Sequence, residues 1–241
     1  MQLSMVRSYG NFTSLVERRY GLFMQIAALL VALMAGVTAA FAQDTGQVAP
    51  QVRPIRLVVL GDSLTAGLGL PGQDAFPAKL QKALQAKGLA VDIANAGVSG
   101  DTSSGGRDRL EWSVPEGIDG VIVELGANDA LRGLDPDVTR AALSDIVARL
   151  KARGIAVMLC GMVAPPNYGS DYAARFNAIY PELAKKFDVP LYPFFLDGVA
   201  AKAELNQADG LHPTAAGVDV IVHNIMPSVE AFIGTIGGHK S

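Results

Sequence analysis

From residue 55 onward, short apolar runs alternate with longer segments in which apolar residues recur at helical spacing. The short runs are rich in β-branched residues, which is typical of strands buried on both faces of a sheet. They predict strands at residues 55–60, 90–94, 120–125, 155–159 and 189–192. The spaced segments predict helices at residues 73–87, 137–153, 171–187 and 214–233.

Strands that alternate with helices form parallel βαβ units, whose helices cover both faces of one sheet. The pattern therefore predicts an α/β protein with a doubly wound sheet of about five parallel strands. In such folds, ligands bind at the carboxyl ends of the strands. Polar residues that directly follow a predicted strand are the first candidates for chemistry.

A different pattern precedes these elements. Arg18 and Arg19 come before an uncharged run at residues 26–42, which ends in Ala40-Phe41-Ala42. A basic region, an apolar stretch and small residues two apart are typical of a secretory signal peptide, here cleaved after Ala42. The alternative is an uncleaved membrane anchor, but the run is short for a span of about 20 residues. The arginine pair leaves the twin-arginine export route open beside the general secretory route.

These features divide the chain into three parts. Residues 1–42 are the expected signal peptide, residues 43–54 are a polar linker that contains proline, and residues 55–241 form one domain. We expect the mature protein in the periplasm or outside the cell, without stable insertion into the membrane after cleavage.

Composition narrows the classes of protein further. Half of the 241 residues are hydrophobic and the net charge is −3, which excludes a disordered chain and argues against a nucleic-acid binder. The one cysteine, Cys160, cannot form an intramolecular disulfide, and its place at the end of an apolar run indicates a core residue. The hydrophobic core must therefore hold the fold by itself.

Two loops carry side chains suited to nucleophilic catalysis. Gly61-Asp62-Ser63-Leu64 follows the first predicted strand, where Ser63 can act as a nucleophile or simply cap a helix. Asp209-Gly210-Leu211-His212 precedes the last predicted helix, where His212 can act as a general base and Asp209 can orient its ring. A plain helix-entry turn is the alternative reading of this second loop.

Two further loops offer hydrogen-bond donors. Residues 95–101 follow the second predicted strand and include Gly100, whose backbone N–H can bind an oxyanion. Residues 126–129 follow the third and include Asn128, whose side-chain amide can do the same. Asn and Gly also favour tight turns without any function. The coincidence of all four loops favours one shared catalytic site.

In this order, the GDSL, NAGVSGD, GAND and DGLHP blocks resemble the GDSL-type esterases of the SGNH hydrolase superfamily. The stretches GDTSSG and LGANDALRG and residues 166–195 resemble its periplasmic thioesterase, arylesterase and lysophospholipase branch. The resemblance implies a three-layer α/β/α, flavodoxin-like fold and a triad of Ser63, His212 and Asp209. It also implies an oxyanion hole formed by the backbone N–H groups of Ser63 and Gly100 and by the Asn128 side chain. No metal or organic cofactor is implied.

The resemblance further implies small-molecule substrates, namely acyl esters and thioesters, with aryl esters and lysophospholipids among them. Ala164 and Pro165 lie in the loop after the fourth predicted strand, where we expect them to contact the acyl chain. We also expect a monomer. A carbohydrate O-deacetylase on the same fold is the alternative, although Trp112 is the one tryptophan available to stack on a sugar. A non-enzymatic binding module is disfavoured, because binding alone does not need an intact triad.

Overall fold

A computed structural model describes residues 53–237. The predicted signal peptide, residues 1–42, and most of the predicted linker lie outside the described residues. The described residues form a sheet of five parallel strands in the order β2-β1-β3-β4-β5, which is the flavodoxin-like order. The strands are β1 (Ile55–Gly61), β2 (Val91–Gly97), β3 (Gly120–Glu124), β4 (Ala156–Cys160) and β5 (Leu191–Tyr192). The predicted fold class is confirmed.

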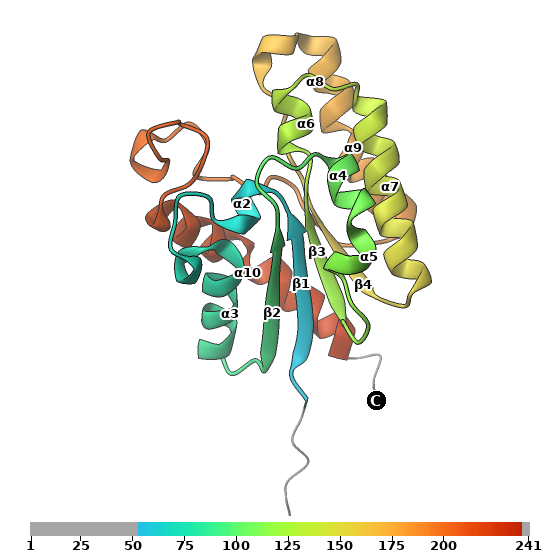
Figure 1. The fold of residues 1–241 in the computed structure, drawn as a ribbon, viewed down its shortest axis with the longest axis vertical. Helices are drawn as coiled ribbons and strands as arrows, with labels where there is room; N and C mark the ends of the chain where they lie inside the picture. Colours follow the sequence, from blue (N-terminus) through green and yellow to red (C-terminus); the bar gives the residue numbers. More distant parts are fainter. Residues whose placement is uncertain (1–52, 238–241) are drawn as a thin grey trace, which may run out of the picture. The chain divides into compact units, whose positions relative to one another are not determined.

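Helices cover both faces of this sheet and make three layers, as Figure 1 shows. On one face, α3 (Phe76–Ala86) and α10 (Ala215–Gly237) pack against each other. On the other face, α7 lies between α4 and α9; their bounds are Pro136–Ala152, Ser103–Asp108 and Ile179–Phe187, respectively. The core between the layers combines aliphatic side chains of the strands with aromatic side chains of the helices and loops. Residues 57–60 of β1 and residues 121–123 of β3 are almost fully buried, as are Phe76 and Phe232.

One helix prediction is wrong. Residues 171–187 do not form one helix but two, α8 (Ser170–Asn177) and α9, which are separated at Ala178. Pro181 explains the break, because proline has no N–H to donate to the carbonyl of Asn177 four residues earlier. Four short helices lack a helical hydrophobic period and were not predicted: α2 (Ser63–Ala66), α4, α5 (Leu110–Ser113) and α6 (Ala127–Leu131).

Among the described residues, α10 is the one helix that is long and apolar enough to cross a membrane. Its apolar side chains, however, belong to the hydrophobic core, where Ile221, Ile225 and Phe232 are almost completely buried. This burial is what a core helix of an α/β protein requires. We therefore assign α10 to the helical layer that covers one face of the sheet.

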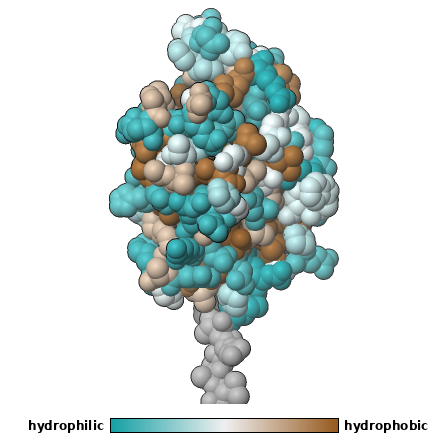
Figure 2. Space-filling model, turned by 60° about the vertical axis from the view of Figure 1, so that its left-hand side comes forward, coloured by the Kyte–Doolittle hydropathy of each residue, from teal (hydrophilic) through white to brown (hydrophobic). Residues whose placement is uncertain are grey.

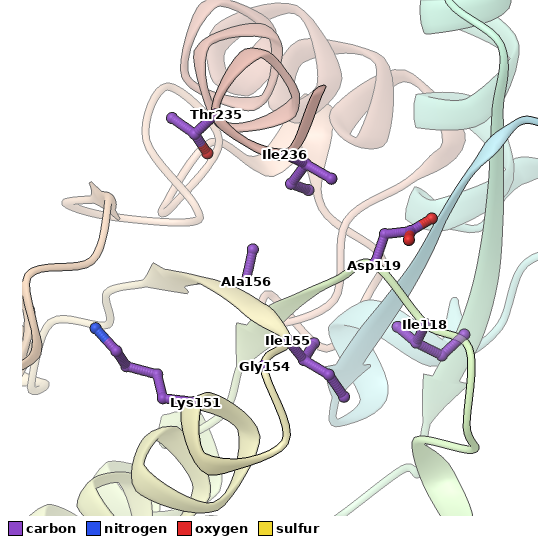
Figure 3. A pocket seen from close by; sticks show the side chains of 8 residues that line it. All are labelled: Ile118, Asp119, Lys151, Gly154, Ile155, Ala156, Thr235 and Ile236. Atoms are coloured by element: carbon purple, nitrogen blue, oxygen red, sulfur yellow. The ribbon is translucent and has the colours of Figure 1, made fainter. Parts of the chain in front are cut away.

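The amino end of the sheet carries a shallow pocket of about 340 Å³ (Figure 3). Its lining comes from the segments that lead into β3 and β4 and from the end of α10: Ile118, Asp119, Lys151, Gly154, Ile155, Ala156, Thr235 and Ile236. These side chains include no serine, cysteine or histidine. On the molecular face drawn in Figure 2, hydrophobic side chains lie in small groups separated by hydrophilic ones.

Candidate active site

The predicted nucleophile lies where β1 passes into α2. Asp62 caps this short helix, because its Oδ1 accepts a hydrogen bond from the Leu64 N–H at 3.0 Å. Gly61 has no room for a side chain, since a Cβ there would lie 2.0 Å from Thr65 Oγ1 and 2.6 Å from Glu124 Oε2. The turn therefore requires glycine at 61, and it places Ser63 in the first turn of α2.

The structure brings the three predicted triad residues together. His212 Nε2 lies 2.9 Å from Ser63 Oγ, and His212 Nδ1 lies 2.6 Å from Asp209 Oδ2. Both distances are within hydrogen-bond range. An ionised Asp209 favours a proton on Nδ1, so Nε2 faces the serine as an acceptor. This arrangement can take a proton from the Ser63 hydroxyl.

Asp209 is held as an acceptor by its own turn. Its Oδ1 accepts the backbone N–H groups of His212 at 3.0 Å and of Leu211 at 2.9 Å. The backbone N–H of His212, the His212 ring and the Leu211 N–H together hold the pKa of Asp209 well below its usual range. Asp209 is therefore ionised at neutral pH.

Gln207 connects the histidine loop to the serine loop. Its backbone N–H donates to the His212 carbonyl at 2.7 Å, and its side-chain Nε2 donates to the Leu68 carbonyl at 2.7 Å. Leu68 follows α2, so Gln207 connects the loop that carries His212 and Asp209 with the segment that carries Ser63. Nothing in the local sequence pattern identified Gln207, because its link to the serine loop runs through Leu68, which is 139 residues away.

The two further predicted donors follow β2 and β3, Gly100 in a loop and Asn128 in the first turn of α6. Gly100 has a φ of +83°, a conformation that favours glycine, and its carbonyl accepts a hydrogen bond from Arg132 Nη2 at 2.7 Å. Asn128 lies on α6, and its Nδ2 donates to Asp62 Oδ2 at 3.0 Å. An amide nitrogen carries two hydrogens, so one remains for another acceptor. The hydrogen bonds among the described residues also leave the N–H of Gly100 without an acceptor.

Two completely buried carboxyl groups, Asp62 and Glu124, lie close to the serine, and neither is among the site residues predicted from the sequence. Burial raises the pKa of Asp62 to about 6, although hydrogen bonds from Leu64 and Asn128 oppose the shift. Burial also raises the pKa of Glu124 well above its usual range, and the charge of Asp62 adds to this. Thr65 Oγ1 donates to Glu124 Oε2 at 2.6 Å. The signal in the sequence that could have identified Glu124 is its charge at the end of the otherwise apolar run of β3.

A third buried carboxylate, Asp129, holds α6 in place. It accepts hydrogen bonds from the Ser103 N–H at 2.8 Å, the Ser103 hydroxyl at 2.5 Å and the Thr139 hydroxyl at 2.9 Å. These bonds join the N-termini of α4, α6 and α7. They restrict the neighbouring Asn128 backbone, so the orientation of its side chain is largely decided by Asp62.

The predicted acyl-binding residues, Ala164 and Pro165, and the single cysteine are all at least partly buried. Ala164 is only 7% exposed and its N–H donates to Asn177 Oδ1 at 2.9 Å, while the adjacent Val163 is 49% exposed. Pro165 is half-buried. Cys160 is buried, and burial raises the pKa of its thiol well above the usual range, which makes it a poor nucleophile. Among the described residues, no cluster of three His, Cys, Asp or Glu side chains is arranged to hold a metal ion.

The chain is similar to known proteins over most of its length. The profile of the GDSL-like Lipase/Acylhydrolase family matches residues 59–220. The chain is 38% identical to Esterase TesA of Pseudomonas aeruginosa over 178 residues, which cover 73% of this chain and 89% of the relative. It is 44% identical to Thioesterase 1/protease 1/lysophospholipase L1 of Escherichia coli over 158 residues, covering 65% of this chain and 74% of the relative.

A solved structure shows the same fold. The crystal structure of AlinE4, an SGNH-hydrolase family esterase, matches with a TM-score of 0.63 and 45% identity, over 74% of this chain and 96% of that chain. The fold and the site therefore define a three-layer α/β/α hydrolase. The chain belongs to the GDSL-like Lipase/Acylhydrolase family.

Proposed function

We propose that this protein hydrolyses acyl esters and thioesters through a covalent acyl-enzyme on Ser63. The observation that carries the proposal is the position of His212, whose Nε2 lies 2.9 Å from Ser63 Oγ while its Nδ1 lies 2.6 Å from Asp209 Oδ2. The names of the relatives, an esterase and a thioesterase with lysophospholipase activity, support the same chemistry.

The reaction has two halves. Ser63 Oγ attacks the carbonyl carbon of the substrate while His212 Nε2 takes the hydroxyl proton. The tetrahedral intermediate collapses, the bond to the alcohol or thiol breaks, and His212 returns the proton to that leaving group. Water then attacks the acyl-enzyme with His212 again as the base, which releases the acid and restores Ser63.

The oxyanion of each tetrahedral intermediate needs donors that are already in place. We assign this role to the backbone N–H groups of Ser63 and Gly100 and to the free hydrogen of the Asn128 amide. Asp62 supports the third donor, because its Oδ2 holds the other hydrogen of that amide at an N–O distance of 3.0 Å. The negative charge of Asp62 thus acts on the orientation of Asn128 rather than on the substrate.

Exposed apolar side chains indicate where an acyl chain can bind. Most of the large hydrophobic side chains at the surface lie in segments next to the triad or after the carboxyl ends of strands: Leu68, Val98, Leu131, Val163, Tyr168 and Leu211. Contact with them removes apolar surface from water, at about 25 cal/mol per Å². They support esters with a hydrocarbon acyl group, with lysophospholipids among the substrates. Direct contact of the acyl chain with Ala164 and Pro165 stays a prediction.

A substrate panel tests this function. Purified protein is assayed with p-nitrophenyl esters of increasing acyl length, an acyl-CoA thioester, a lysophospholipid and acetyl-xylan, with Ser63→Ala as the matched control. We expect hydrolysis of the acyl esters and the thioester, and none by the control. Preferential release of acetate from acetyl-xylan would instead favour the O-deacetylase, whereas a lack of hydrolysis of every substrate would overturn the proposal.

We also propose that the mature protein is exported as a monomer and works without a cofactor. The basic residues Arg18 and Arg19 and the apolar run that ends at Ala42 support export to the periplasm or the medium. N-terminal sequencing of the exported protein should begin at Gln43. Sedimentation should give the mass of one chain, and activity should survive dialysis against a chelator.

A further inference from the structure

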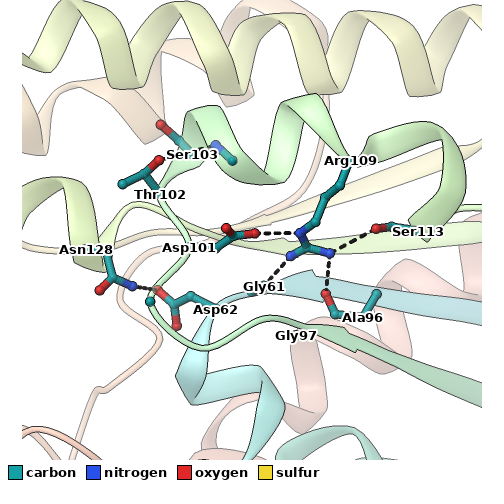
Figure 4. A network of polar contacts seen from close by, with 12 residues as sticks. Gly61, Asp62, Ala96, Gly97, Asp101, Thr102, Ser103, Arg109, Ser113 and Asn128 are labelled. Carbon is teal, nitrogen blue, oxygen red and sulfur yellow. Dashed lines mark hydrogen bonds and ion pairs between the residues drawn. The ribbon is translucent and has the colours of Figure 1, made fainter.

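Arg109 stands out because its charged side chain is buried near the site without any part in the reaction. The residue is 7% exposed, and all three of its guanidinium nitrogens donate hydrogen bonds within the fold (Figure 4). Burying a cation is costly unless it is paired and hydrogen-bonded. The hydrogen bonds of Arg109 offset this cost, and a neutral side chain could not donate all of them.

The acceptors of Arg109 lie on both sides of the predicted oxyanion hole. Nη2 donates to the carbonyl of Gly61 at 2.7 Å, and Nε donates to Asp101 Oδ2 at 2.5 Å. Gly61 ends β1 two residues before Ser63, and Asp101 directly follows Gly100. Nη1 donates to the carbonyl of Ala96 in β2 at 2.8 Å, so one planar group joins the ends of two adjacent strands.

The Gly100 loop depends on such anchors, because glycine has no side chain with which to fix itself. The carbonyl of Gly100 is held by Arg132, and the following residue is held through its carboxylate by Arg109. Asp101 also closes the turn, since its N–H donates to the Val98 carbonyl at 3.1 Å. The Gly100 N–H belongs to the Ser99–Gly100 peptide. The carbonyls on either side of this peptide group, those of Val98 and Gly100, both accept hydrogen bonds, which fixes its position.

We propose that Arg109 is a positioning residue, which holds the backbone N–H groups of Ser63 and Gly100 at the spacing that an oxyanion requires. The inference rests on the proposed function. The guanidinium suits this task because its donors form a rigid fork, whereas a lysine ammonium is a flexible point charge and cannot reach all the same acceptors. Donors displaced by about 1 Å can cost about 100-fold in rate.

Arg109→Lys tests the proposal, with Arg153→Lys as the matched control. Arg153 also donates to loop carbonyls, those of Val114 at 2.5 Å and Pro115 at 3.4 Å, but none of its partners belongs to the site. We expect Arg109→Lys to lower kcat by about 10- to 100-fold with KM within about threefold. The rate at which an alkyl p-nitrophenyl phosphonate modifies Ser63 should fall by a similar factor. Arg153→Lys should leave both rates unchanged.

Asp101→Asn provides a second variant in case Arg109→Lys does not fold. It keeps the size of the side chain and removes the charge that pairs with Arg109, so kcat should fall in the same direction by a smaller factor. A merely structural role would lower the melting temperature and leave the rates per folded molecule intact. Wild-type kcat in folded Arg109→Lys or Asp101→Asn, or an equal loss in Arg153→Lys, would overturn the proposal. If Ser63→Ala still abolished hydrolysis, the proposed function would stand without it.

Discussion

The amino end and the carboxyl end of the sheet are built from the same strands but differ in how they treat charge. At the amino end, the Asp119 side chain is buried, but it pairs at 2.8 Å with Arg53, whose side chain is half exposed. The nearby pocket is lined by four aliphatic residues together with polar residues and a glycine. At the carboxyl end, Asp62 and Glu124 are completely buried, and the Arg109 guanidinium is nearly so.

The difference indicates that the carboxyl end loses some stability, because it buries ionisable groups that support the site. Burial raises the pKa of Asp62 and Glu124, which means that their ionised forms are destabilised in the folded protein. In return, the buried groups hold backbone and amide donors that surround Ser63. At the amino end, Asp119 accepts hydrogen bonds from the Arg53 side chain and from the Arg56 N–H, which lie at the opposite end of β1 from Ser63. Substitutions at the reactive carboxyl end and at the supporting amino end should therefore have different effects.

The largest effect is expected at the nucleophile. Ser63→Ala removes the atom that attacks the substrate, so kcat should fall by about 10⁴- to 10⁶-fold. The fold should not change, because the β-carbon and the backbone of α2 remain. Steady-state hydrolysis of a p-nitrophenyl ester and circular dichroism check the two halves of this prediction. Substantial activity in a folded variant would refute the assignment of Ser63.

A smaller effect is expected at the third oxyanion donor. Asn128→Ala should lower kcat by about 10²- to 10³-fold, because the amide is needed mainly when charge develops on the oxygen. KM should change little, since this bond strengthens in the transition state. Steady-state kinetics give both constants. A variant in which only KM changes would place Asn128 in substrate binding instead.

The next effect is expected at the acid that orients this donor. In Asp62→Asn, the new amide can accept from Leu64 or from Asn128, but its nitrogen would face a donor at the other contact. We expect kcat to fall by roughly 10- to 100-fold, which corresponds to the loss of one hydrogen bond to a charged acceptor, about 1.5–3 kcal/mol. Wild-type kcat in Asp62→Asn would show that Asn128 keeps its orientation without Asp62.

The same variant has a predicted pH dependence of stability. The pKa of Asp62 is raised from 3.8 to about 6, so the folded protein binds more protons than the unfolded chain between these values. Its contribution to the free energy of unfolding therefore falls as the pH rises from about 4 to about 6, and is constant above that. Urea unfolding of wild type and Asp62→Asn should show their difference growing in favour of the variant across this window. If the difference in the free energy of unfolding between the two proteins did not change with pH, the raised pKa of Asp62 would be contradicted.

The smallest effect on catalysis is expected at the amino end. Ile155→Val removes one methylene group from a buried position in the pocket lining, and should lower the free energy of unfolding by about 0.5–1.5 kcal/mol. Its kcat should equal that of the wild type, because no donor near Ser63 depends on Ile155. Denaturant unfolding and steady-state kinetics provide the two measurements. A clear loss of kcat would show that the two ends of the sheet are coupled.

The fold was largely predictable from local pattern. Short apolar runs indicated all five strands. The reason is clearest for β1, β3 and β4, which are almost fully buried and need continuous apolar sequence, whereas β2 is partly exposed. The break at Ala178 was missed because an amphipathic period continues through it, although Pro181 marked the place. The helices α2, α4 and α6 are too short to show a period. Side-chain caps, Asp62 and Thr102, mark the start of α2 and α4, whereas α6 begins after Gly126 without a side-chain cap.

The candidate site divides in a similar way. Ser63, His212 and Asp209 were predictable because each lies in a loop whose residue types have few other uses in combination. Arg109, Gln207 and Glu124 were not, because each is joined to the serine loop by a partner far away in the sequence, namely Gly61, Leu68 and Thr65, respectively. Loops that carry chemistry are therefore visible in the sequence, whereas the side chains that hold those loops are not.

Labelling by an alkyl p-nitrophenyl phosphonate tests the central claim most directly. The reagent forms a bond from phosphorus to the nucleophilic oxygen and releases p-nitrophenolate, so mass spectrometry of the intact chain and of its peptides locates the modified residue. The account predicts one adduct per chain, located on Ser63, with activity lost in proportion and no adduct in Ser63→Ala. Full activity in a completely modified protein, or an inactivating adduct on another residue, would contradict it.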